Sequence, residues 1–233
     1  FVSLFSSLNP SQQYTNWRNY SDLKNINDFA LSGSEIWAAT AGGVFKYNFE
    51  NQSFHVLSKT DGLNGTLITS VTTDKYGKVW FGSVDGKIDV YDPANNSFKT
   101  ILDIFTSDKT NKRINELRTS GDTIYAATDF GISLINSVNY FFYDTYFKFG
   151  SLTSNIKVNS TLNDGIIYSC TEAGLAISKI NAINLSAPES WDVYQVGSGL
   201  ISNNVLKVFQ YRDSLIAATD KGFSIFNGIS WQP

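Results

Sequence analysis

The stretch Val79-Trp80-Phe81-Gly82-Ser83, followed by Gly86, decides the fold because its pattern occurs five times in the chain. In each copy a short apolar strand ends in a small residue and a Thr or Ser, and a Gly follows three residues later. These glycines are separated by 43, 45, 43 and 48 residues, a period typical of β-propeller blades and longer than that of helical repeats. The other copies are 36–40 with Gly43, 124–128 with Gly131, 167–171 with Gly174 and 215–219 with Gly222.

The second repeat predicts the layout of one blade most clearly. Alternating apolar and polar residues favour strands at 68–73, 79–83, 88–91 and 97–102, with turn-forming residues between them. The other repeats place turn formers where the first hairpin must reverse. The sequence therefore predicts an all-β chain, a β-propeller of four-stranded antiparallel blades with about four complete blades and most of a fifth.

The start of the chain predicts export and a larger ring. The chain contains no Met, and residues 1–14 are interpreted as a signal-peptide remnant and a linker before a partial propeller domain at 15–233. An ordinary inner strand or a truncated transmembrane segment is the alternative; nothing later approaches the roughly 20 apolar residues that span a bilayer. Residues 16–20 resemble an outermost strand, although the fifth repeat starts its own at 229–231. The intact ring is therefore predicted to have at least six blades, and we expect seven.

Composition argues against several classes of function. The net charge of -3 offers no basic field for phosphate backbones, so nucleic acid is not an expected partner. The single cysteine, Cys170, occupies the small-residue position of the repeat and is expected to be buried, while the single histidine, His55, lies in a predicted outer strand. A disulfide framework, a zinc site and a Cys/His dyad are all disfavoured, and the sequence predicts neither metal nor cofactor.

Three of the repeated turns carry an acid directly after the Thr: Asp129, Glu172 and Asp220. Each can accept backbone N–H groups within its own turn, and each is also a candidate for ligand contact. Because the acid recurs with the repeat and not at one place, turn capping is the favoured interpretation. None of the three belongs to a Ca²⁺ loop, which needs alternating ligands on one short segment.

Three charged residues fall on predicted innermost strands, near the mouth of a central channel: Asp28, Glu116 and Lys207. The longer connections between blades are expected on the same face as the glycine turns. Loops on one face of a rigid scaffold are common binding sites, so ligand contact is expected at these connections and at the three charged residues. The connections are 59–66, 103–113, 148–154 and 197–203.

Two levels of family resemblance are visible. Residues 71–83 with Gly86 resemble the repeat of two-component regulator propellers, in which an Asp and a Gly precede an aliphatic residue and Trp. Further features are similar to the N-terminal propeller of PorZ-like proteins of the type IX secretion system, and the likeness extends from Trp17 to Trp231. These features are 86–90, 124–132 with 143–146, and 184–191.

The resemblance to PorZ-like proteins implies a non-enzymatic scaffold exposed at the outer membrane. Its implied partners are proteins of a secretion or sortase complex, or a glycan such as lipopolysaccharide. The alternative is the periplasmic glycan-sensing propeller of a hybrid two-component receptor, which the repeat fits nearly as well. A glycan-cleaving enzyme is the weakest hypothesis: it needs two carboxylates roughly 5 to 9 Å apart, and Asp28 and Glu116 are predicted two blades apart. We therefore predict no catalytic residue.

Overall fold

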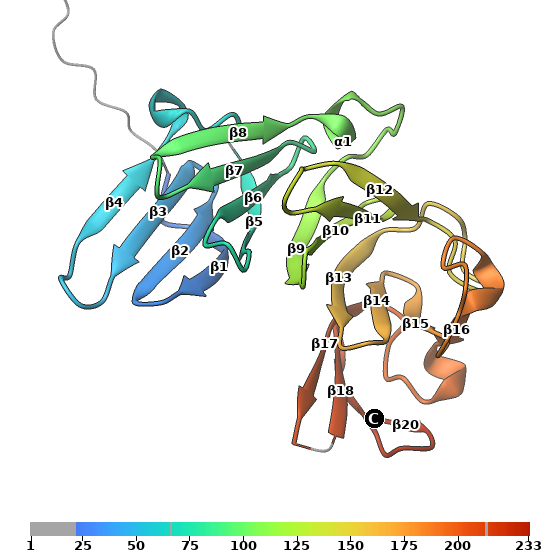
Figure 1. Cartoon of the computed structure of the whole chain (residues 1–233). Coiled ribbons are helices and arrows are strands. Elements are labelled where there is room, and N and C mark those ends of the chain that lie inside the picture. Colours follow the sequence, from blue (N-terminus) through green and yellow to red (C-terminus); the bar gives the residue numbers. More distant parts are fainter. Residues whose placement is uncertain (1–21, 66, 213) are drawn as a thin grey trace, which may run out of the picture.

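The computed structural model describes residues 22–65, 67–212 and 214–233, which form five four-stranded antiparallel sheets. Within each sheet the strands follow chain order, so hairpins join neighbouring strands. The sheets are arranged around a common axis as an open arc, from the blue first blade to the red fifth (Figure 1). The predicted propeller of four-stranded blades is confirmed.

The blades are numbered in chain order. Blade 1 contains β1 (Ile26–Ser32), β2 (Glu35–Thr40), β3 (Gly43–Asn48) and β4 (Phe54–Leu57), and blade 2 contains β5 (Ile68–Thr73), β6 (Val79–Ser83), β7 (Ile88–Asp92) and β8 (Ser97–Ile101). Blade 3 contains β9 (Ile114–Ser120), β10 (Thr123–Thr128), β11 (Gly131–Asn136) and β12 (Phe142–Tyr146). Blade 4 contains β13 (Val158–Asn163), β14 (Ile167–Thr171), β15 (Gly174–Ser178) and β16 (Trp191–Tyr194). Blade 5 contains β17 (Val205–Tyr211), β18 (Ser214–Thr219), β19 (Gly222–Phe226) and β20 (Trp231–Gln232). A short helix α1 (Asp103–Thr106) and 3-10 turns at Lys59–Asp61, Pro188–Ser190 and Val196–Ser198 lie between strands.

The end of blade 5 differs from the prediction. All four of its strands form, and β20 begins at Trp231, not at 229. The reason is local: Asn227 Oδ1 accepts the N–H groups of Ile229 and Ser230, each at 2.9 Å, and this closes a turn where a strand was expected. The predicted leader at 1–14 and the predicted strand at 16–20 lie outside the described residues.

Aromatic and small side chains fill the space between blades. Trp37 of blade 1 is 1% exposed and packs on Phe81 and Tyr91 of blade 2, with ring centroids 6.1 and 5.4 Å away. A Cβ added to Gly82 would lie 2.6 Å from a methyl carbon of Ile114 in blade 3. The small residue of the repeat therefore lets neighbouring blades approach closely, as the sequence predicts.

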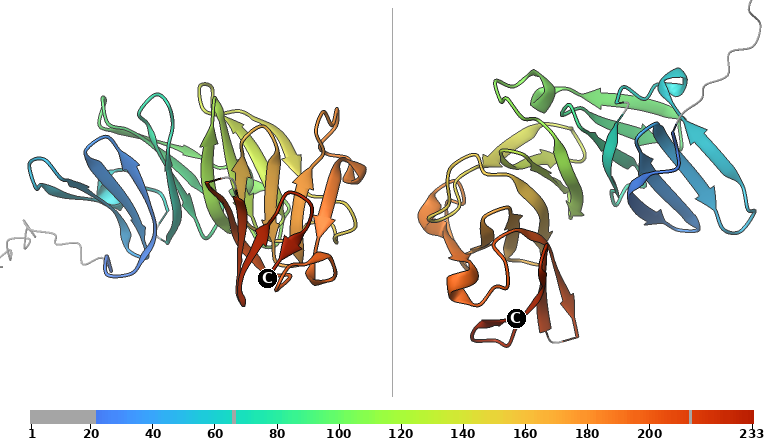
Figure 2. Two further views of the ribbon diagram at one scale, coloured as in Figure 1. Left: turned by 90° about the horizontal axis from the view of Figure 1, so that it is seen from below. Right: turned by 180° about the vertical axis from the view of Figure 1, so that it is seen from behind.

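The arc has two faces, at opposite ends of the strands, and the two faces carry different loops. The repeated glycine turns lie against the connections between blades: Cβ atoms added to Gly43 and Gly174 would lie 3.0 and 2.8 Å from the carbonyl oxygens of Leu57 and Tyr194. We call this face the connection face. The first and third hairpins of each blade turn on the opposite face, which we call the hairpin face. Figure 2 shows the blades side by side in two further views. Within the described part of the chain, no helix is long and apolar enough to cross a membrane.

Candidate functional site

The charged residues predicted near the channel occupy one repeated position. On each inner strand this residue pairs with the small residue of the neighbouring strand, just after a β-bulge in every blade. Asp28, Glu116 and Lys207 are therefore equivalent positions of blades 1, 3 and 5. The pairs are Asp28 with Ala39, Ser70 with Gly82, Glu116 with Ala127, Ser160 with Cys170 and Lys207 with Ala218.

Both carboxylates at this position bind the backbone of the following blade. Asp28 Oδ2 accepts the N–H of Val71 at 2.9 Å, and Glu116 Oε2 accepts the N–H of Thr161 at 2.8 Å. Burial raises the pKa of Asp28, whereas hydrogen bonds from the backbone and the charge of Lys207 oppose that rise. The two acids thus join successive inner strands, and each is engaged at its own blade boundary.

Glu116 also connects blade 3 to blade 5. Its Oε1 lies 3.1 Å from Lys207 Nζ and 3.9 Å from a guanidinium nitrogen of Arg118. The carboxylate side chain is 11% exposed and that of Lys207 is 53% exposed, so solvent reaches the cation far more than the anion. Of the three charged residues predicted near the channel, the structure therefore brings Glu116 and Lys207 together in one cluster. It is built as a structural ion pair and not as two carboxylates facing a common substrate.

The acids of the glycine turns do not cap those turns in the way the sequence suggested. The Thr hydroxyl does so: Thr128 Oγ1 accepts the N–H of Phe130 at 3.2 Å and donates to the carbonyl of Gly131 at 2.9 Å. The Thr hydroxyls are buried and therefore need hydrogen-bond partners, which the turn backbone supplies. Thr40, Thr171 and Thr219 make the same pair of hydrogen bonds.

The three turn acids instead point to separate places. Asp129 Oδ1 accepts from the side-chain amide of Asn115 at 3.0 Å. A side-chain hydrogen bond from Ser202 is the main cause of a lowered pKa at Asp220. Glu172 is exposed on its own blade. The structure therefore distributes Asp129, Glu172 and Asp220 over three blades, and among the described residues no group of three or more His, Cys, Asp or Glu could hold a metal ion.

One repeated interaction escaped the sequence prediction. In blades 1 to 4, the side chain of the residue that precedes the channel residue donates a hydrogen bond to a carbonyl at the start of the next inner strand, which makes a series of hydrogen bonds between blades. The signal was present, since an Ile or Val, then Asn or Thr, then a polar residue recurs at the start of four inner strands. The bonds are Asn27 to Ile68 O at 2.7 Å, Thr69 to Ile114 O at 2.5 Å, Asn115 to Val158 O at 2.8 Å and Asn159 to Val205 O at 2.8 Å.

Known proteins with this architecture include surface and receptor domains. PorZ, an essential bacterial surface component of the type IX secretion system of Porphyromonas gingivalis, is 19% identical with a TM-score of 0.71, and the match covers 89% of this chain and 27% of PorZ. The extracellular domain of the putative one-component system BT4673 of B. thetaiotaomicron is 17% identical with a TM-score of 0.72, covering 92% of this chain and 28% of that one.

A third similar structure is the extracellular domain of the putative hybrid two-component system BT3049 of B. thetaiotaomicron, 18% identical with a TM-score of 0.69, covering 91% of this chain and 29% of that one. The chain thus spans less than a third of the length of each of these structures. No curated protein matches it. At these identities the structures show a common fold. The family model described as "TSS9, PorZ, N-terminal beta-propeller domain" matches residues 12–192, more than half of the sequence, and the chain therefore belongs to the PorZ N-terminal β-propeller family.

Proposed function

We propose that this chain is an exported, non-enzymatic propeller that holds a protein partner of a type IX secretion assembly on its connection face. Membership of the PorZ family supports the assembly, and the extracellular location of the similar receptor domains supports export. The engagement of Asp28 and Glu116 in separate blade boundaries supports a role without catalysis. Rigid blades with variable loops suit partner recognition.

The observation that carries this proposal is an aromatic side chain held out from the connection face. Phe105 lies on α1, between blades 2 and 3, and is 39% exposed. Lys87 Nζ lies 4.7 Å from its ring centroid, and Lys112 Nζ donates to the Phe105 carbonyl at 2.7 Å. Leu102 beside it is 42% exposed. A fixed aromatic surrounded by cations and apolar carbon is the kind of residue enriched in protein interfaces.

The test uses the full-length gene in the organism that encodes it. Phe105→Ala is expected to weaken the complex with the secretion machinery by about tenfold or more, because it removes an interface anchor. Phe141→Ala is the matched control, since Phe141 is 71% exposed but lies in a loop of the hairpin face. Crosslinking from position 105 to known type IX components, with loss of cargo secretion in the Ala variant, would support the proposal. Equal secretion by both variants would contradict it.

The receptor alternative rests on the similarity to the BT4673 and BT3049 extracellular domains, whose TM-scores of 0.72 and 0.69 lie close to the 0.71 of PorZ. The sequence encoded after Pro233 separates the two functions. A second propeller and a sorting domain would favour the secretion role. A transmembrane helix followed by kinase or DNA-binding domains would make the chain a sensor and overturn the proposal.

A further inference from the structure

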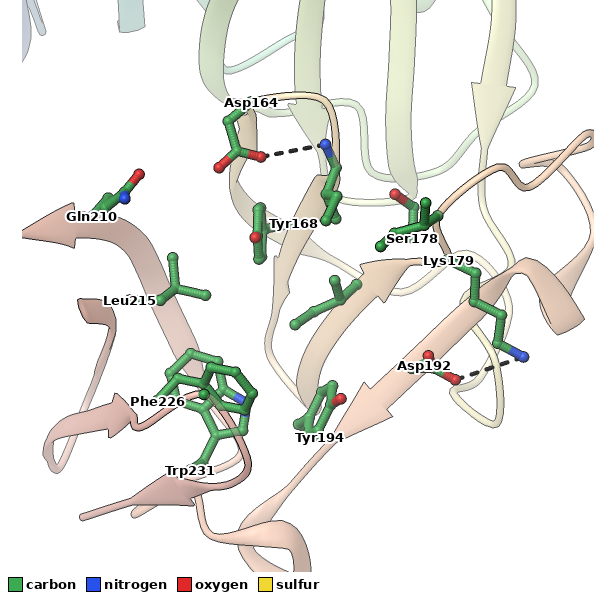
Figure 3. Close-up of a pocket in the computed structure, with 14 residues that line it drawn as sticks. Asp164, Tyr168, Ser178, Lys179, Asp192, Tyr194, Gln210, Leu215, Phe226 and Trp231 are labelled. Carbon is green, nitrogen blue, oxygen red and sulfur yellow. Dashed lines mark hydrogen bonds and ion pairs between the residues drawn. The ribbon is translucent and has the colours of Figure 1, made fainter. Parts of the chain in front are cut away.

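A pocket opens between blades 4 and 5 on the hairpin face, away from the proposed partner surface. It has a volume of about 540 Å³, within the range of roughly 300 to 1,000 Å³ that holds small ligands. Figure 3 shows that side chains from the hairpins of both blades surround it. Apolar side chains form its wall, and three charged side chains stand at its rim.

The wall of the pocket is aromatic, and two of its rings are partly open to solvent. Tyr194 and Phe226 are half-buried, and their ring centroids lie 6.3 and 5.3 Å from that of the buried Trp231. Leu215 extends the wall beyond Phe226, as Figure 3 shows. Aromatic rings attract cations, and a planar guanidinium also stacks on a ring while its alkyl stem packs on carbon. The wall therefore suits a planar cation with an apolar stem.

The rim of the pocket carries more negative charge than positive charge. Asp164 is exposed at the mouth and forms no ion pair within the described part of the chain. Asp192 Oδ1 lies 3.6 Å from Lys179 Nζ, and the two side chains are exposed by 57% and 48%, so this ion pair is loose. Two carboxylates against one ammonium disfavour an anionic ligand and favour a cation.

The rim also offers more hydrogen-bond acceptors than donors. A carboxylate only accepts, and Asp164 uses one of its two oxygens, on the N–H of Ile166 at 3.3 Å. Gln210 donates its amide nitrogen to the Arg212 carbonyl at 3.4 Å, which leaves its amide oxygen as a further acceptor. Burial raises the pKa of Tyr168, and the Asp164 charge raises it further, so that carboxylate acts on the wall of the pocket. A ligand that fits this rim brings several donors.

We propose that this pocket binds the side chain of an arginine residue in a peptide segment of another protein. A guanidinium is planar and positive, has five N–H donors and no acceptor, and grips a carboxylate with two parallel hydrogen bonds. A lysine ammonium brings the charge but neither the plane nor the fork. Free arginine brings an α-carboxylate that meets the negative rim, whereas in a peptide that group is a neutral amide. The inference does not rest on the proposed secretion role, because the two surfaces lie on opposite faces.

The experiment measures binding by NMR in the ¹⁵N-labelled chain, with the Gly228 amide and the Trp231 indole N–H as reporters that line the pocket. The main probe is N-acetyl-arginine amide, which presents arginine as it occurs within a peptide. N-acetyl-citrulline amide has nearly the same shape without the charge, N-acetyl-lysine amide has the charge without the plane, and free arginine adds the carboxylate. We expect the arginine amide to shift both signals saturably and the other three probes to bind more weakly, citrulline amide by tenfold or more.

Three variants separate recognition from folding. Asp164→Asn keeps an acceptor for the Ile166 N–H and is expected to weaken binding of the arginine amide about tenfold, the effect of one charge-assisted hydrogen bond. Glu172→Gln is the matched control: it makes the same charge change at an exposed acid of blade 4 on the connection face, and binding should not change. Lys179→Ala removes the competing ammonium and should tighten binding about threefold, a gain that a folding defect cannot produce.

The proposal is overturned if the arginine amide shifts neither reporter, or if the citrulline amide, the lysine amide or free arginine binds as tightly. It is also overturned if Asp164→Asn and Glu172→Gln have the same effect, or if Lys179→Ala does not tighten binding.

Discussion

Replacing Glu116 tests whether one carboxylate joins the inner strands of blades 3, 4 and 5. Glu116→Ala removes the acceptor 2.8 Å from the Thr161 N–H and leaves that buried donor unpaired, at a cost of about 1 to 3 kcal/mol. Loss of the ion pair adds at most about 1 kcal/mol, because the Lys207 side chain is 53% exposed and screened by solvent. We therefore expect the free energy of unfolding to fall by about 2 to 3 kcal/mol.

Glu116→Gln separates the two contributions. The amide oxygen can still accept from Thr161 while the charge is lost, so the expected decrease is about 1 kcal/mol or less, similar to that of Lys207→Ala. For a chain of this size each kcal/mol lowers Tm by about 2 to 4 °C, which predicts a decrease of roughly 4 to 12 °C for the Ala variant.

Calorimetry gives Tm for these variants, and hydrogen exchange at the Thr161 amide reports the bond itself. Exchange at that amide should accelerate in Glu116→Ala and stay close to wild type in Glu116→Gln and Lys207→Ala. Equal losses of Tm in the Ala and Gln variants, or unchanged exchange at Thr161 in the Ala variant, would refute the reasoning that the backbone bond matters more than the ion pair.

Three further predictions concern the repeated positions. Gly131→Ala should lower the stability in thermal unfolding more than Gly222→Ala does. Both residues have positive φ, at 138° and 133°. An added Cβ at Gly131 would lie 2.2 Å from the backbone oxygen of Tyr146, whereas at Gly222 the nearest atom is a flexible methyl carbon 3.5 Å away. Asn115→Ala should cost about 1 to 2 kcal/mol in urea unfolding, because it removes the bond to the Val158 carbonyl between blades and the bond to Asp129 within the blade. A neutral result would remove the role assigned to the bond between blades. Burial raises the pKa of Cys170 from 9.0 to about 12, so the neutral thiol contributes stability that is complete below pH 9 and is lost as the pH rises toward 12. Tm should therefore fall over this pH range, and less steeply in Cys170→Ala. An unchanged slope in the variant would contradict the raised pKa.

The blade plan could be predicted from the sequence because its signals are local. A strand that alternates in polarity, a small residue and a positive-φ glycine each depend on neighbours within one repeat, and β5 and β6 lie at the predicted positions. The start of β20 was wrong because Asn227 captures two N–H groups in a turn that apolar Ile229 gave no reason to expect.

The site was predicted less well because it depends on neighbouring blades. The places of Asp28, Glu116 and Lys207 on the inner strands were predicted, but their partners lie far away in the sequence. Asp28 and Glu116 bind the next blade, about 45 residues away, and Lys207 pairs with Glu116, two blades away. The pocket between blades 4 and 5 was missed entirely. Trp231 and Asp164 both line it but come from different repeats, and no periodicity within one repeat indicates that they share a space.

Blade 5 lacks the hydrogen bond that the other four blades make from one inner strand to the next. Where blades 1 to 4 carry Asn or Thr, blade 5 carries Leu206, which has no side-chain donor and is 44% exposed. Four further apolar or aromatic residues of β17 and β19 are exposed by 39% to 60%: Phe209, Tyr211, Phe223 and Ile225. An apolar sheet face of this kind is uncommon on the surface of a monomer. If the predicted further blade lies here, apolar packing holds it in place of a bond from the bulge residue. Replacing Leu206 by Asn would then restore the pattern of the other four blades without disturbing the five already formed.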